Sequence, residues 1–271
     1  MSKVYRYLYA LSLLLFGFLS SAQSSKGFYS IPAQQFNYQP SIDEGIDTTF
    51  IQRAKVHTIS TDDFSLSRQI SLADYKVFVA AQPVEEQQKH YPDSNITTAN
   101  AYREYWETDD YNKYPALGIS WDSALAYCRW RTLSEQKDGS YTYYYILPTL
   151  KQWLNAFRYL DGKRKKHDLN RDYADWLFNM PPPLNASFIH DLTPDLVNDM
   201  RYAADFRPNR LTIGASYRLQ FAKIMDYARF ERNKAFGYPD VGFRMVKVFF
   251  PSVVEQQSIM DRMIIDEWKL F

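Results

Sequence analysis

The sequence is short of cysteine, of glycine and of net charge. Cys128 is the only cysteine among 271 residues, so no intramolecular disulfide is available. The nine glycines form neither a GxGxxG nor a GxxxxGK[ST] pattern, which excludes nucleotide cradles of those two types. The formal net charge of +1 gives no basic field, so we expect no nucleic acid among the partners.

Long apolar runs are also scarce, and the clearest one lies at the N-terminus. Residues 8–19 form it, with Lys3 and Arg6 before it and small residues at 20–22 after it. It is shorter than the ~20 apolar residues of a membrane span. We therefore expect residues 1–22 to be a signal peptide, and the protein to be periplasmic or outer-membrane-associated. An uncleaved anchor stays open as the alternative. Because no cysteine lies near the cleavage site, we expect membrane association to be only indirect.

Aromatic residues, in contrast, are plentiful, at 17% of the chain. Hydrophobic residues make up 46% and charged residues 23%, a composition that excludes bulk disorder. The sequence therefore predicts a folded core built from rings and a surface suited to protein contacts.

The chain divides into four parts. After the signal segment, residues 23–55 are polar and weakly patterned, and we expect an N-terminal arm. Residues 56–250 form one domain. Residues 251–271 have apolar side chains at i, i+4 and i+8, which predicts an amphipathic helix. That helix either packs on its own domain or docks on another protein.

Capping residues predict three helices. Ser71 begins a helix over 72–81, and Ser120 begins a helix over 121–136. Residues 149–152 have the form of a capping box, which begins a third helix.

Strands are predicted by short apolar or aromatic runs. These runs cover residues 141–147, 211–217 and 241–249. Residues 82–113, rich in Tyr, Asn and Asp, predict a long surface loop.

An ordered set of motifs resembles the formylglycine-generating-enzyme (sulfatase-modifying factor) family. The motifs lie at residues 114–121, 124–132, 147–153, 213–217 and 242–244. The resemblance implies an α+β, C-type-lectin-like fold, low in regular structure, with a twisted mixed sheet and two main helices. It also implies that two of its tryptophans, at 130 and 153, are buried near each other. The residues that carry this fold signature are Trp121, Cys128, Trp130, Pro148, Trp153, Gly214, Gly242, Phe243 and Arg244.

A narrower set of residues is similar to the gliding-motility and type IX secretion lipoproteins of that family. It comprises the run at 91–94, Tyr111, the Tyr-Pro pair at 114–115 and the Trp-Arg-Thr run at 130–132. That resemblance implies envelope proteins of a secretion or motility complex as partners. The lipid-bearing cysteine of those lipoproteins is lacking in this sequence.

The polar chemistry of the family is largely missing. Its formylglycine-forming members use a pair of late cysteines that hold copper, whereas this chain has none after Cys128. The nearest fragment to the family's GNVxEW region is at residues 198–200. His90, His167 and His190 are too scattered for a metal cluster. We therefore expect no catalytic residue, no cofactor and no metal, and we do not expect an enzyme.

These observations predict a non-catalytic, exported structural or interaction component of an outer-membrane-associated assembly, of the type IX secretion or gliding-motility kind. The alternatives are a metal-dependent oxidising enzyme of the same superfamily and a glycan- or peptide-binding module. Aromatic and arginine side chains often carry interface energy. The candidate partner-binding residues are Tyr217, Arg218, Arg229, Arg232, Met260, Ile264 and Trp268.

Overall fold

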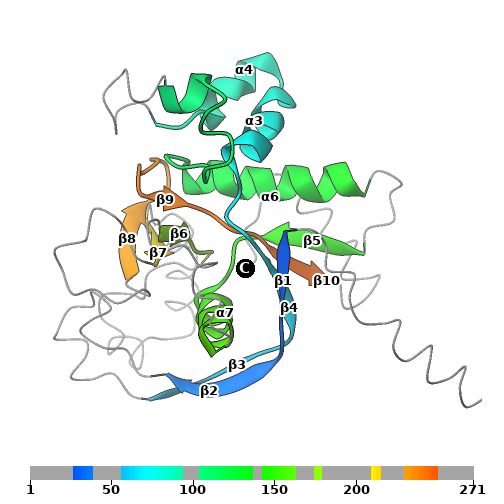
Figure 1. Ribbon diagram of the computed structural model, residues 1–271, viewed down its shortest axis with the longest axis vertical. Helices are drawn as coiled ribbons and strands as arrows, with labels where there is room; N and C mark the ends of the chain where they lie inside the picture. The colour runs from blue at the N-terminus through cyan, green and yellow to red at the C-terminus, as the bar shows by residue number, and fades with distance from the viewer. Residues whose placement is uncertain are drawn as a thin grey trace, which may run out of the picture.

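Among the residues that the structure describes, three small sheets combine with three longer helices (Figure 1). The computed structural model describes residues 27–38, 56–93, 104–136, 142–162, 174–178, 209–214 and 229–249. The expected signal segment and C-terminal helix lie outside these residues. No helix in the described part of the chain is long and apolar enough to cross a membrane.

The first sheet is antiparallel, with strand order β1-β4-β10-β5. Its strands are β1 (Phe28–Ile31), β4 (Phe64–Ser67), β10 (Val246–Phe249) and β5 (Tyr143–Ile146). β1 comes from the start of the described chain and β10 from its end, so this sheet ties the two ends together.

A bent ribbon extends from this sheet. β2 (Gln34–Tyr38) pairs with β3 (His57–Thr61) in the same register that pairs β1 with β4. Pro32, which has no backbone N–H, interrupts one side, and the pair Asp62-Asp63 interrupts the other. Residues 27–38, which fall within the expected N-terminal arm, are thus paired with strands of the domain.

The third sheet is mixed, with strand order β8-β7-β6-β9. β6 is antiparallel to β7 and parallel to β9. The strands are β8 (Arg229–Asn233), β7 (Asn209–Ile213), β6 (Ala174–Trp176) and β9 (Val241–Gly242).

All three helices begin at the residues that the sequence predicts. In α3 (Leu72–Ala80) and α6 (Trp121–Glu135), the hydroxyls of Ser71 and Ser120 accept hydrogen bonds from backbone N–H groups of the first turn. In α7 (Leu150–Gly162), Gln152 Oε1 accepts from the Thr149 N–H at 2.9 Å, and Thr149 Oγ1 accepts from the Gln152 N–H at 3.3 Å. The capping box is therefore confirmed.

Two sequence expectations are corrected. The predicted loop 82–113 contains α4 (Val84–Gln87), the 3₁₀ helix η2 (Gln88–His90) and one helical turn at 104–107. The predicted strand 241–249 divides into β9 and β10, which belong to different sheets. The chain between them turns the Arg244 side chain into the interior, where it is 1% exposed.

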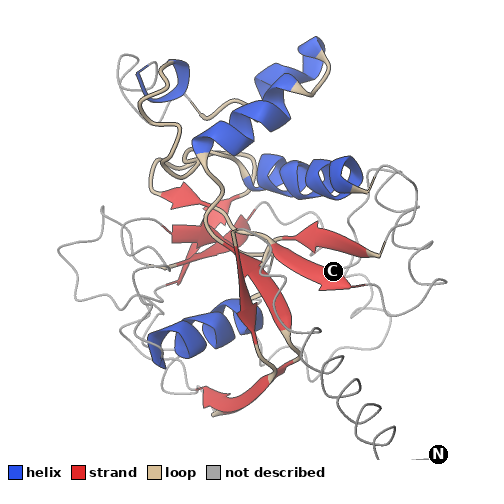
Figure 2. Cartoon of the chain, turned by 45° about the vertical axis from the view of Figure 1, so that its right-hand side comes forward, coloured by secondary structure: helices blue, strands red, loops and turns tan. Residues whose placement is uncertain are grey.

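The apolar interior forms two clusters. The larger lies among α3, α6 and the first sheet, and the smaller joins α7 to β3, β7 and the segment after β6. α6 and α7 lie on opposite sides of the sheets (Figures 1 and 2), and Trp130 packs against the larger cluster while Trp153 belongs to the smaller one. Trp130 is half-buried beside Phe78 and Tyr127, whereas Trp153 is buried and stacks on Phe157. The expected Trp130–Trp153 pair was wrong.

Two glycines allow close backbone packing near the start of α6. A Cβ atom on Gly237 would lie 1.6 Å from the Gly118 carbonyl oxygen, so a side chain there requires the backbone to move. Gly118 has a φ of 75°, in the left-handed region that favours glycine. Its N–H donates to the Tyr238 carbonyl at 3.0 Å, and its carbonyl accepts from the Asp93 N–H at 2.9 Å.

Candidate functional site

A buried carboxylate in β6 is the centre of a polar network. Asp175 is 3% exposed and forms an ion pair with Arg244, whose Nε donates to Oδ2 at 2.8 Å. The same oxygen accepts from Trp153 Nε1 at 3.1 Å, and Oδ1 accepts from Gln69 Nε2 at 2.8 Å. Both carboxylate oxygens are thus engaged, as a charge in a low-dielectric interior requires.

This arrangement holds the fold together. The four side chains come from the segment before α3, from α7, from β6 and from the link between β9 and β10. Arg244 Nη1 also donates to the Ser67 carbonyl of β4 at 3.3 Å, which connects the first sheet to the third. Asp175 therefore acts as an internal counter-ion, and its geometry does not suit an acid or base that meets a substrate.

Sequence reasoning missed Asp175. The nearest fragment to the family's GNVxEW region, at residues 198–200, lies outside the described residues. An available signal was an acid in the apolar run 174–178, because a strand buried on both faces tolerates a charge only when it is paired.

The single cysteine does not fit a copper centre of the kind that the resemblance implies. Cys128 is 0% exposed within α6, and burial raises the pKa of its thiol well above the usual range. A soft metal needs thiolate ligands that converge. The sequence has only this one cysteine, so no thiolate pair is available within the chain.

Most of the remaining fold-signature residues are buried where they join elements. Trp121 Nε1 donates to the Leu177 carbonyl at 2.9 Å, and the Pro148 carbonyl accepts from the Phe178 N–H at 3.0 Å. Gly214 follows β7 with a φ of 114°. Phe243 lies edge-on to Tyr75 and Tyr127. A Cβ on Gly242 would lie 3.4 Å from the carbonyl oxygen of Ala116, a tight contact in the interior.

The expected partner-binding residues are only partly described. Arg232 donates to both carboxylate oxygens of buried Asp240, at 3.1 and 2.8 Å, and its guanidinium lies 4.6 Å from the centre of the Tyr238 ring. The Arg232 charge is thus compensated within the fold, which favours a structural role. Arg229 lies in β8, and its side chain is not described. Outside the described residues lie Tyr217, Arg218, Met260, Ile264 and Trp268.

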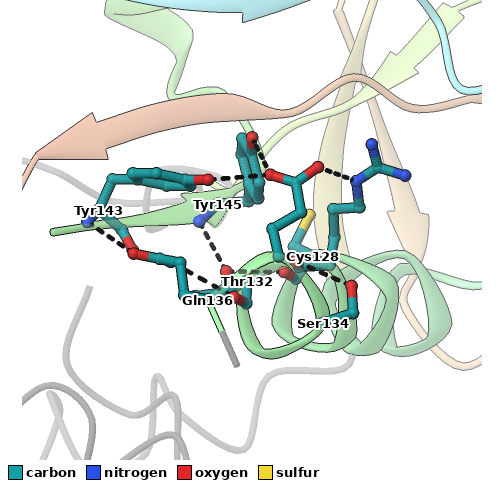
Figure 3. Close-up of polar contacts among 8 residues, drawn as sticks. Cys128, Thr132, Ser134, Gln136, Tyr143 and Tyr145 are labelled. Atoms are coloured by element: carbon teal, nitrogen blue, oxygen red, sulfur yellow. Dashed lines mark hydrogen bonds and ion pairs between the residues drawn. The ribbon is translucent and has the colours of Figure 1, made fainter. Parts of the chain in front are cut away.

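A polar network joins the end of α6 to the outer strand of the first sheet (Figure 3). Glu135 accepts from Arg131 Nε at 2.5 Å and from the hydroxyls of Tyr143 and Tyr145 at 3.0 and 2.7 Å. Burial, and then the bond to Glu135, raise the pKa of Tyr145. Lys247 Nζ lies 3.5 Å from the centre of the Tyr143 ring. These polar groups fix α6 on β5.

A histidine and a serine meet at the start of α6. His90 Nδ1 lies 3.0 Å from Ser123 Oγ, and burial lowers the pKa of His90. The Ser123 hydroxyl donates to the Lys89 carbonyl at 3.2 Å and is buried, so it is not presented to a substrate. Among the described residues, no three histidine, cysteine, aspartate or glutamate side chains gather as a metal site requires.

An open cleft lies where the ribbon, α7 and β10 meet. Its volume is about 590 Å³, within the range of ligand sites. Residues 60–64 form one wall and residues 247–249 another, with Thr149, Lys151 and Gln152 at the start of α7. It combines hydroxyls, carboxylates, ammonium groups and the ring of Phe249, which is 64% exposed.

Comparison with known proteins identifies the family. A family model described as a sulfatase-modifying factor enzyme 1-like domain matches residues 18–180, more than half of the chain. The chain therefore belongs to the sulfatase-modifying factor family, and the expected fold class is confirmed.

Two solved structures are similar to this chain. CarF shares 14% sequence identity with a TM-score of 0.48, and the alignment covers 83% of this chain and 98% of CarF. Variable protein 1 of Treponema denticola shares 12% identity with a TM-score of 0.48, covering 81% of this chain and 93% of that protein. Comparison with curated proteins gives no match.

Proposed function

We propose that this chain is a non-catalytic, exported interaction component of an outer-membrane-associated assembly, of the type IX secretion or gliding-motility kind. The observation that supports it most concerns buried Asp175. Both of its carboxylate oxygens accept hydrogen bonds within the fold, from Arg244, Trp153 and Gln69. The family fold is retained, while the buried ionisable groups described above serve packing. A fold used in this way functions through its surface.

The residues that carry the resemblance to the type IX lipoproteins lie close together in the fold. Asp93, from the run at 91–94, donates its N–H to Gly118, four residues after Tyr114. The ring of Tyr91 lies 5.4 Å from that of Trp106. Trp106 and Phe78 both lie beside Tyr75, and Phe78 also contacts Trp130. The shared residues thus belong to one local unit. We infer envelope proteins of such a machine as partners.

A pull-down of the tagged full-length protein from native envelope, in gentle detergent, tests the proposal. We expect stoichiometric recovery of outer-membrane secretion or motility proteins, identified by mass spectrometry. A monomer recovered without partners would overturn it. Copper or iron retained at one equivalent through purification would instead favour an oxidising enzyme.

A further inference from the structure

The cleft opens at a gap in the strand pairing of the first sheet. β10 pairs with β5 along all four of its residues, from Val246 to Phe249. It pairs with β4 only at Val246 and Lys247. β4 begins at Phe64, so no strand within the described residues lies beside Phe249 on the β4 side, and Val248 and Phe249 both line the cleft.

The opposite side of the gap is the turn that interrupts the ribbon. Asp62 and Asp63 follow β3 and are exposed, while Phe64, the first residue of β4, is buried. All three line the cleft. The ribbon therefore bends away from β10 where an extended neighbour would be needed to complete the sheet.

We propose that this cleft binds an extended segment of a partner polypeptide, which lies beside Val248 and Phe249 where β4 leaves β10. The inference rests on the proposed function as an interaction component, and it assigns that function a surface and a kind of ligand. A strand flanked on one side only presents backbone donors and acceptors, and an added strand uses them.

The charges in the cleft fit a polypeptide. Asp62 and Asp63 provide negative charge on one wall, while Lys151 and Lys247 provide positive charge on the others. A peptide carries both signs and also backbone polar groups, so it compensates both walls. A neutral glycan would stack on Phe249 but carries no charge to pair with Asp62, Asp63 or Lys151. The chemistry favours the peptide.

Site-specific photo-crosslinking tests this assignment. The probe is p-benzoylphenylalanine in place of Phe249, in the full-length protein within native envelope. The ring of Phe249 is exposed, so the replacement is compatible with the fold. We expect a covalent adduct with a partner, and peptide mapping should place it within one continuous segment of that protein. The same probe in place of Val77, 60% exposed on α3, is the positional control and should not give that adduct.

Charge variants provide a second readout. The double variant Asp62→Asn and Asp63→Asn should lower the adduct yield at position 249 by about three- to tenfold, because partner cations lose their counter-charge. The matched control is Asp109→Asn with Asp110→Asn, another adjacent and exposed acidic pair, which should leave the yield unchanged. Equal yields in the two double variants would contradict the assigned charge role.

Three outcomes overturn the proposal. One is no polypeptide adduct at position 249, as expected if a glycan occupies the cleft. Another is an adduct only with residues 251–271 of this chain, and the third is an equal adduct from position 77. The pull-down distinguishes these failures from failure of the proposed function. If partners are recovered while position 249 gives no adduct, the interaction function stands and only the cleft assignment falls.

Discussion

At the scale of single residues, the fold depends on one buried charge pair. Asp175 and Arg244 are 3% and 1% exposed, and Asp175 accepts from Trp153 of the smaller apolar cluster. Such a pair adds little net stability over an apolar pair, but removing one partner leaves an uncompensated buried charge. The Asp175–Arg244 pair therefore contributes mainly by fixing the positions of β6 and of the link between β9 and β10 relative to each other.

The variant Asp175→Asn tests this role. It keeps the size of the side chain but leaves the Arg244 charge without a counter-ion. We expect the free energy of unfolding to fall by about 3–5 kcal/mol, measured by urea denaturation. Asp122→Asn is the control, because Asp122 is exposed and lies 3.6 Å from Lys234, so it should cost less than about 1 kcal/mol. Equal effects would mean that the buried pair is not needed.

Buried tyrosines predict a loss of stability at high pH. Burial raises the pKa of Tyr144 from 10.0 to about 12. Burial is also the largest cause of the raised pKa of Tyr75, Tyr127 and Tyr145. Above pH 10 the unfolded chain loses protons that the folded chain keeps. Stability is therefore complete below about pH 10 and falls as the pH rises toward 12, by at most about 1.4 kcal/mol per pH unit for each group.

The measurement is phenolate absorbance and circular dichroism across this pH range. We expect part of the phenolate signal to appear together with loss of secondary structure, because the buried hydroxyls ionise on unfolding. Complete ionisation near pH 10 with unchanged circular dichroism would show that these four tyrosines are solvated.

At the scale of elements, the sequence predicted structure that depends on neighbouring residues, but not structure that depends on residues far apart in the chain. Ser71, Ser120 and Thr149 cap helices within a few residues of themselves, so sequence located the helix starts. β6 has only three residues, and its acid is neutralised by Arg244, 69 positions later. Residues 27–38 form strands only because β4 and β3 pair with them. Such pairing leaves little periodic pattern in a single sequence.

The outer edge of β5 is covered by α6, and this cover predicts a further outcome. Gln136 Nε2 donates to the Tyr143 carbonyl at 2.7 Å, and its Oε1 accepts from the Thr142 and Tyr143 N–H groups at 2.8 and 3.3 Å. Thr132 Oγ1 accepts from the Tyr145 N–H at 2.8 Å. Two side chains thus replace the neighbouring strand that β5 lacks among the described residues.

Gln136→Leu should uncover this edge. The lost hydrogen bonds leave strand groups unsatisfied, so we expect a cost of about 2 kcal/mol in urea denaturation. The exposed tyrosine-rich strand should also promote association, visible as concentration-dependent light scattering. Ser134→Ala, which removes only a bond to the Arg131 carbonyl, is the matched control and should change stability by less than about 0.5 kcal/mol. An unchanged Gln136→Leu protein would show that the cover is dispensable.

At the scale of the whole molecule, the Asp175 network is one of the polar connections between the two apolar clusters. Trp153 belongs to the smaller cluster and donates to Asp175, while Arg244 reaches Ser67 beside the larger one. Sequence motifs identified Trp153 and Arg244 as parts of the fold. They did not indicate that α6 and α7 lie on opposite sides of the sheets, because the distance between two helices depends on how the strands between them pair.

This connection predicts that the molecule unfolds as one unit, and the single cysteine provides the probe. Cys128 lies in the larger cluster with a thiol that is 0% exposed and has a raised pKa, so alkylation requires opening of that cluster. We expect labelling at least about a thousandfold slower than in a free cysteine peptide, given ordinary domain stability. The opening free energy from labelling in low urea should equal the unfolding free energy from tryptophan fluorescence. If these two free energies agree in the wild type but differ in the Asp175→Asn variant, the Asp175–Arg244 pair couples the two clusters. Disagreement already in the wild type would mean that the two clusters open independently.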